Sequence, residues 1–236
     1  TVDVLWGIRF NNERSWFLAH KEEFQQQVDA PLRALADQVG QTIAEEFPKL
    51  GLQTKVSRIY RDARRLHGRG PYKDHLWFTL GRPGENGSAQ PCFYFEVAPE
   101  YYSYGMGTYD PTPLTMAKLR ARIDRDPKPL ERLARRLEKR GEFVLEGAEY
   151  KRPKGDPGPL LYPWYNRRRI LLSSDHNCDL FHPGAGRADG GGLPFPDALL
   201  PVFAGPGRGR TPARGIIRDT HRPGRRKRCA WSLFAF

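Results

Sequence analysis

The chain has 236 residues and carries 39 Lys and Arg against 27 Asp and Glu, so its formal net charge at pH 7 is +12. This length accommodates one domain with a core that needs neither disulfides nor a structural metal, and three widely spaced cysteines, Cys92, Cys178 and Cys229, fit neither a disulfide framework nor a Cys-x-x-Cys metal site. No apolar run approaches the ~20 residues of a membrane span and no signal-peptide pattern is present, so we expect a cytoplasmic protein without a membrane partner.

The N-terminal part of the chain predicts helices. Asn11 and Asn12 are expected to cap a helix, since a short polar side chain can bond the first free backbone N–H groups. Asp29 before Pro31 indicates a break between two consecutive helices, because proline is accepted only in a helix's first turn. Apolar residues spaced mostly three and four apart mark the face that both helices bury: Phe17, Phe24, Val28, Leu32, Leu35, Val39, Ile43 and Phe47.

A block of strands follows these helices. Residues Lys55–Asp62 alternate with the period of a strand and carry charge on both faces, and His75–Leu80 is a compact apolar strand. Gly81–Pro91 is dense in Gly, Pro and Asn, so we expect a hairpin-like loop before the aromatic strand Cys92–Val97.

The next segment mixes glycines, helices and short strands. Gly105 and Gly107, which follow a run of tyrosines, indicate a bulge or a tight turn. Further helices are predicted at 112–123 and Pro127–Arg140, and further strands at Phe143–Leu145 and Arg168–Leu172. Because strands and helices occupy separate blocks, we expect an α+β fold, a mainly antiparallel sheet covered by helices, in a single domain of residues 1–177.

Residues 178–236 differ from the rest in composition. They are rich in Gly, Pro, Ala and Arg, carry a net charge of +6, and show no sustained period of helix or strand. The codons for His182–Ala204 can be chosen freely among synonyms, and the message can then be read one base forward. One of the translations allowed in this way has the pattern of an amphipathic helix. We therefore interpret this irregular tail as the product of a frameshift, with natural disorder and a functional basic tail as the alternatives.

Five short motifs occur in a specific order along the chain. They are NNERSWFLAHKEEF (Asn11–Phe24), RIYRD (Arg58–Asp62), PYKDH (Pro71–His75), YYSYGMGTYDP (Tyr101–Pro111) and EYKRPKG (Glu149–Gly155). Together they resemble the bacterial conserved-hypothetical family known as domain of unknown function 2461, over residues of about 5 to 177. The resemblance implies the fold and its extent but no activity, and the family's usual final helix resembles the shifted translation.

Basic and aromatic residues crowd the segment between Arg58 and His75. An Arg that faces the core needs a carboxylate or a ligand anion, because an unpaired buried charge is costly, and its planar guanidinium suits phosphate or carboxylate groups. We therefore expect a basic cleft that binds a phosphate- or carboxylate-bearing small molecule. The candidate ligand-binding residues are Arg58, Arg61, Tyr72, Lys73, Lys151 and Lys154.

Two residues in this segment are candidates for proton transfer. If the protein is an enzyme, Asp62 or His75 would be the acid or base, since each neighbours basic residues that tune its pKa. The histidines lack the spacing of metal ligands, so we expect no metal, and no motif predicts a cofactor.

Other interpretations of the same residues stay open. Ion pairs inside the protein would also account for the arginines, and tyrosines interleaved with arginines are typical both of nucleic-acid binding and of half-buried strands. A nucleic-acid-binding module and an interaction protein without a pocket are therefore the alternative functions. The sequence indicates neither an enzymatic reaction nor an oligomeric state.

Overall fold

The computed structural model describes residues 2–66, 68–83 and 90–177, and within them the sheet has six strands in the order β1-β2-β3-β4-β6-β5, with every neighbouring pair antiparallel. The strands are β1 (Gln53–Val56), β2 (Leu76–Gly81), β3 (Cys92–Val97), β4 (Tyr101–Gly107), β5 (Val144–Glu146) and β6 (Leu171–Asn177). The helical segments are α1 (Val2–Phe10), α2 (Arg14–Ala19), α3 (Lys21–Phe24), η1 (Gln25–Asp29), α4 (Ala30–Glu46), η2 (Pro48–Leu50), η3 (Ala63–Arg65), α5 (Pro113–Arg125), α6 (Lys128–Arg140) and α7 (Tyr162–Tyr165). This architecture confirms the predicted α+β class.

One face of the sheet forms the hydrophobic core. The register places Phe78 of β2 beside Phe95 of β3, which in turn lies beside Tyr104 of β4. Both phenylalanines are fully buried, and their ring centroids lie 5.5 Å apart. Because side chains alternate along a strand, Trp77 and Glu96 point to the opposite face. That face therefore carries the polar side chains, while the core takes the apolar ones.

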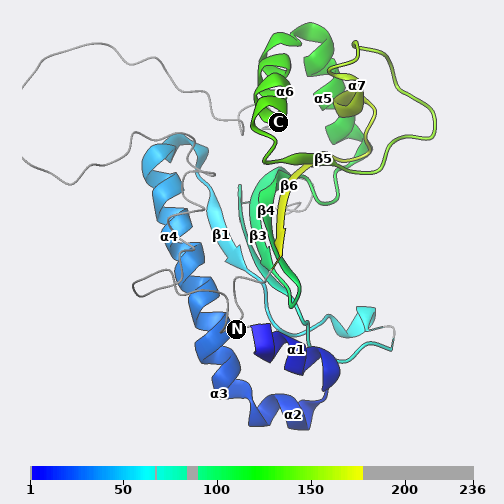
Figure 1. The fold of residues 1–236 in the computed structure, drawn as a ribbon. Coiled ribbons are helices and arrows are strands. Elements are labelled where there is room, and N and C mark those ends of the chain that lie inside the picture. Colours follow the sequence, from blue (N-terminus) through cyan, green and yellow to red (C-terminus); the bar gives the residue numbers. More distant parts are fainter. Residues whose placement is uncertain (1, 67, 84–89, 178–236) are drawn as a thin grey trace, which may run out of the picture.

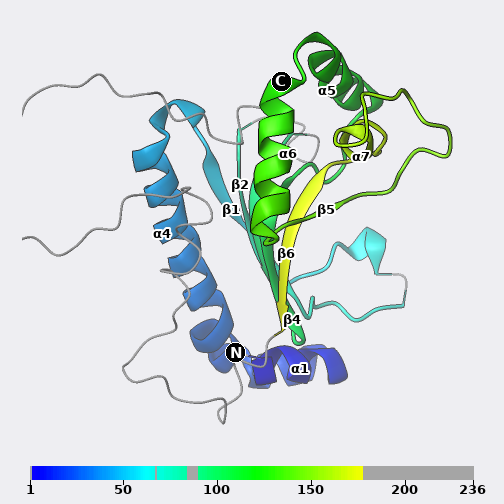
Figure 2. The ribbon, with the colours of Figure 1, turned by 45° about the horizontal axis from the view of Figure 1, so that its top comes forward.

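Helices cover the core face and close both ends of the sheet, as Figure 1 shows. α4 packs along β1 and β2. α1 and α2 lie at one end of the sheet, whereas α5, α6 and α7 gather at the other end, beside β5. In both views the connection between β1 and β2, which contains η3, lies on the side of the sheet away from α4 (Figure 2).

The predicted break between two N-terminal helices is wrong. The backbone stays helical from α3 through η1 into α4, with Asp29 at φ −68° and Ala30 at φ −65°. η1 is a π-helical turn in which the N–H of Ala30 bonds the carbonyl of Gln25. Pro31 lies in the first turn of α4, directly after this π-helical turn, so the chain passes through the proline without leaving the helical conformation.

The predicted turn at Gly105 and Gly107 is also wrong, because both glycines lie within strand β4. Gly105 pairs with Ser173 of β6, and a Cβ atom built on it would lie 1.9 Å from the carbonyl oxygen of Leu172. Here glycine allows two strand backbones to approach closely, which is a separate use from forming a turn.

Several boundaries differ from those predicted. α1 was not predicted, and its buried residues Val4, Leu5 and Ile8 extend the core at the N-terminal end. β1 ends at Val56, so the strand expected over Lys55–Asp62 is shorter than its alternation indicates. The frameshifted tail predicted for 178–236 lies outside the described residues.

Within the described part of the chain, no helix has both the length and the apolar composition to cross a membrane.

Candidate functional site

The pairing of β1 with β2 continues beyond the sheet and joins two of the motifs. Tyr60 and Tyr72 form an antiparallel bridge. On either side of it, the N–H of Lys73 donates to the carbonyl of Ile59 at 2.8 Å and the N–H of Arg61 donates to that of Pro71 at 2.8 Å. This two-stranded extension holds the Arg58–Asp62 and Pro71–His75 segments against each other, so their side chains project from one rigid unit.

Asn12 and Phe17 fix this extension to the N-terminal helices. The amide of Asn12 accepts the backbone N–H of Tyr72 at 2.9 Å and donates to the carbonyl of Tyr72 at 3.0 Å. The ring of Tyr72 packs on Phe17 at 4.1 Å between centroids and is 4 % exposed. The prediction that Asn11 and Asn12 cap a helix is wrong, because Glu13 holds the N-cap position of α2. Tyr72 serves here as a buried anchor.

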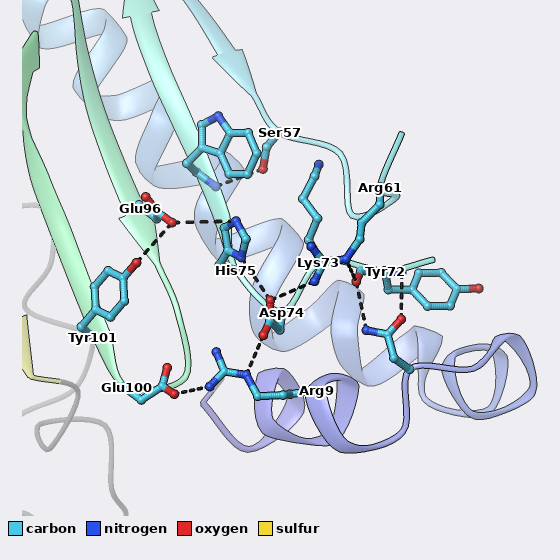
Figure 3. A network of polar contacts seen from close by, with 12 residues as sticks. Arg9, Ser57, Arg61, Tyr72, Lys73, Asp74, His75, Glu96, Glu100 and Tyr101 are labelled. Carbon is cyan, nitrogen blue, oxygen red and sulfur yellow. Dashed lines mark hydrogen bonds and ion pairs between the residues drawn. The ribbon is translucent and has the colours of Figure 1, made fainter. Parts of the chain in front are cut away.

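Asp74 lies at the centre of a network of charged side chains, drawn in Figure 3. Its carboxylate pairs with Nε of Arg9 at 2.5 Å, with Arg61 at 3.2 Å and with Nδ1 of His75 at 3.1 Å. Arg9 also pairs with Glu100. Burial alone would raise the pKa of Asp74, but hydrogen bonds from His75 and Arg9 lower it to about 2. Asp74 is therefore ionised at neutral pH and ties α1 to the start of β2.

His75 lies between two carboxylates. Since ionised Asp74 can only accept, Nδ1 of His75 carries the proton that the two share. In the neutral ring, Nε2 is then the basic nitrogen, and it lies 4.0 Å from Oε1 of Glu96. The hydroxyl of Tyr101 donates to Glu96 at 3.5 Å. Burial raises the pKa of Glu96, and burial together with Glu96 raises the pKa of Tyr101 to about 12. The arrangement orients His75 and leaves Nε2 able to take a proton.

Lys73 and Arg58 form a cationic edge beside this network. The ammonium of Lys73 donates to the backbone carbonyl of Arg58 and lies 4.8 Å from the ring centroid of Trp77. The imidazole of His75 stacks on the same tryptophan at 5.6 Å. Burial lowers the pKa of Lys73, and the positive charges of Arg58 and Arg61 lower it further. The three cations thus lie close enough to repel one another.

Arg61 has a structural role in the two-stranded extension. Its Nε donates to the carbonyl of Tyr72 at 2.7 Å and its Nη2 pairs with Asp74, so the side chain is only 16 % exposed. Arg61 therefore crosses the two-stranded extension and holds it closed.

Asp62 contacts its own loop at η3 and is not part of the network around His75. Its carboxylate accepts the backbone N–H of Arg64 at 3.1 Å, which caps η3, and pairs with the Arg64 guanidinium at 2.7 Å. This is the geometry of a local cap.

The structure places Lys151 and Lys154 at the other end of the sheet. Their segment follows β5, whose last residue, Glu146, pairs with Leu171 at the start of β6. Lys73 and His75 instead precede Leu76, at the opposite ends of β3 and β4. The predicted ligand-binding residues therefore form two groups: Arg58, Arg61 and Lys73 come together with His75, and Lys151 and Lys154 do not join them.

Arg9 and Asp74 were not among the residues that the sequence analysis singled out. They pair across 65 positions, and no local pattern connects α1 to β2. Glu96 lies between buried Phe95 and Val97 in β3, and that alternation is a usable signal, since it places a carboxylate on the polar face beside β2. Among the described residues, no group of three His, Cys, Asp or Glu side chains is arranged to hold a metal ion.

Fold and network together define an α+β domain in which a half-buried carboxylate, Asp74, pairs with two arginines and a histidine at one end of an antiparallel sheet. The chain belongs to the family described as conserved hypothetical protein (DUF2461), whose model matches residues 1–181. This confirms the resemblance carried by the five motifs. No curated protein and no solved structure matches the chain.

Proposed function

We propose that the protein binds a small molecule bearing a phosphate or carboxylate group, held by Arg58, Lys73 and Arg61. One observation carries this proposal. Asp74 is shared by Arg9, Arg61 and His75, whereas neither Arg58 nor Lys73 pairs with a carboxylate of the described residues. Positive charge on this edge therefore exceeds negative charge. Burial lowers the pKa of Lys73 most, and repulsion from Arg58 and Arg61 lowers it further; an oxyanion placed there would relieve that repulsion.

His75 gives the bound molecule a neighbouring acid or base. Its ring and the ammonium of Lys73 both contact Trp77, so an anion held by Lys73 would lie near the imidazole. Asp74 fixes the ring through Nδ1, which is the usual way in which a carboxylate orients a catalytic histidine. If the protein is an enzyme, we assign proton transfer to Nε2 of His75 and no role in it to Asp62.

The test measures thermal stabilisation by a panel of phosphorylated and carboxylated metabolites. Arg58→Gln and Lys73→Met should abolish the rise in melting temperature that the best anion gives to the native protein. Arg64→Gln is the matched control, because Arg64 is 88 % exposed and pairs with Asp62. Arg61 is a poorer choice, since its loss would also release Asp74.

Two outcomes would overturn the proposal. In one, no anion stabilises the native protein, or the anion acts equally on all three variants. In the other, binding is to nucleic acid, weakens steeply with salt and falls by a similar amount for every cation removed, Arg64 included.

A further inference from the structure

A second group of cations surrounds Tyr150, in the loop after β5. The guanidinium carbon of Arg120, on α5, lies 5.5 Å from the centroid of the Tyr150 ring. The ammonium of Lys154 lies 4.9 Å from the same centroid. Cation–π attraction favours each contact. Two positive charges are thereby held close to one aromatic ring.

One N–H-bearing nitrogen of the half-buried Arg120 lacks the partner that a buried donor requires. Its Nη1 is buried and makes no hydrogen bond to any described residue. Arginine stays protonated in proteins, so this N–H group needs an acceptor. Asp124 lies one helical turn along α5, but its carboxylate accepts the hydroxyl of Tyr165 at 3.1 Å and forms no ion pair with Arg120.

Arg167 offers a comparison within the same region. Its Nε is also buried without a hydrogen bond. However, its Nη1 donates to the carbonyl of Gly147 and its Nη2 lies 3.8 Å from Glu149. The charge of Arg167 is thus balanced by an ion pair, whereas Arg120 forms no ion pair with a carboxylate of the described residues.

The loop that carries Lys154 is held in place by Asn166. This side chain is 2 % exposed, accepts the backbone N–H of Lys154 at 2.7 Å and donates to the carbonyl of Gly155 at 2.9 Å. Gly155 lies against Tyr165 so closely that a Cβ would come within 2.8 Å of its ring. These bonds fix the backbone at Lys154, from which the side chain reaches the same Tyr150 ring that Arg120 contacts.

We propose that Arg120, Lys154 and Tyr150 form a second oxyanion site, which takes a phosphate or carboxylate group. It lies beyond the pairing of Glu146 with Leu171, so about one seven-residue strand, roughly 20 Å, separates it from the site at Lys73. The inference rests on different residues from the proposed function and does not depend on it.

Calorimetric titration of inorganic phosphate into the double variant Arg58→Gln/Lys73→Met isolates this site. In that background, Arg120→Met should weaken phosphate binding about 10- to 100-fold, the loss expected for one charge-assisted contact. Lys118→Met, an exposed cation of the same helix, is the control and should leave the affinity unchanged. A parallel titration with acetate shows whether the site prefers a phosphoryl or a carboxylate group, and loss of either anion in Arg120→Met supports the proposal.

A second readout separates binding from structure. Without anion, Arg120→Met should melt no lower than its parent, because it removes a nitrogen, Nη1, that is buried without a hydrogen bond, while the phosphate-induced rise should disappear. Equal destabilisation with and without phosphate overturns the proposal, as does an unchanged phosphate affinity in both Arg120→Met and Lys154→Met. If Arg58→Gln/Lys73→Met binds as well as the native protein and Arg120→Met does not, the proposed function fails and this site stands.

Discussion

Asn12 pairs with Tyr72 as a neighbouring strand would, accepting its N–H and donating to its carbonyl through one side-chain amide. Asn12→Ala removes both bonds, so the N–H of Tyr72 loses its partner and the carbonyl of Tyr72 keeps only the bond from Nε of Arg61. We expect a loss of about 1–3 kcal/mol in the free energy of unfolding, measured by urea denaturation. Asn11→Ala, which removes one exposed bond to the carbonyl of Gly7, should change stability far less. Equal effects would contradict this account of the anchor.

Asp74 should contribute stability that depends on pH in the acid range. Its pKa is lowered from 3.8 to about 2, so its contribution is complete above about pH 4 and is lost as the pH falls toward 2. Asp74→Asn should therefore cost about 2 kcal/mol at pH 7, and the difference from the native protein should narrow between pH 4 and pH 2. Urea titrations at pH 7, 4 and 3 measure it.

Asp62→Asn is the matched control for Asp74→Asn. Asp62 is 39 % exposed and caps η3, and asparagine caps almost as well as aspartate. Its variant should follow the native pH dependence. If Asp62→Asn and Asp74→Asn lose stability alike, the network around Asp74 has no special role.

Gly105→Ala should be among the most damaging small substitutions in the sheet. The added methyl group would meet the backbone of Leu172, which can move only if β4 separates from β6. We expect little folded protein on expression, judged by soluble yield and far-UV circular dichroism. Gly81→Ala is milder, since its nearest neighbour would be the Cβ of Cys92 at 3.2 Å. A native-like Gly105→Ala protein would show that the β4–β6 contact can relax.

Cys92 should react slowly in the folded protein. Burial raises the pKa of its thiol from 9.0 to about 11, which lowers the thiolate fraction about 100-fold near pH 8. Alkylation by iodoacetamide, followed by peptide mapping, should label Cys92 much faster in urea than in buffer. Similar rates in the two conditions would argue that the start of β3 is open to solvent.

The sequence predicted the elements whose patterns are local. The helix caps at Thr112 and Gly141 mark real boundaries, since Thr112 accepts an N–H from Thr115 and Gly141 takes the left-handed conformation at φ 65°. The β3 boundaries match those expected, since a continuous run of residues that favour strands fills Cys92–Val97 and its side chains alternate in burial along the whole strand. The glycines of β4 misled the prediction because a glycine that admits a neighbouring strand has the same sequence signature as one that forms a turn.

The candidate site was only partly predictable for a different reason. Arg58, Arg61, Lys73 and His75 come together because two adjacent motifs pair as strands, which sequence spacing can indicate. Arg9 reaches the same place from α1, and its position depends on how that helix packs across the end of the sheet. The expected union with Lys151 and Lys154 did not occur, since strand direction, which the motifs do not encode, sends their loop to the far end.

The strand order has a bearing on how the chain assembles during synthesis. β6, which comes last in the described sequence, lies between β4 and β5, and β5 pairs with no other strand of the described residues. In a nascent chain that has left the ribosome only as far as α7, the edge of β4 that later pairs with β6 therefore has no partner strand. Until residues 171–177 emerge, β4 presents an unpaired strand edge, which is the kind of surface through which partly folded chains associate.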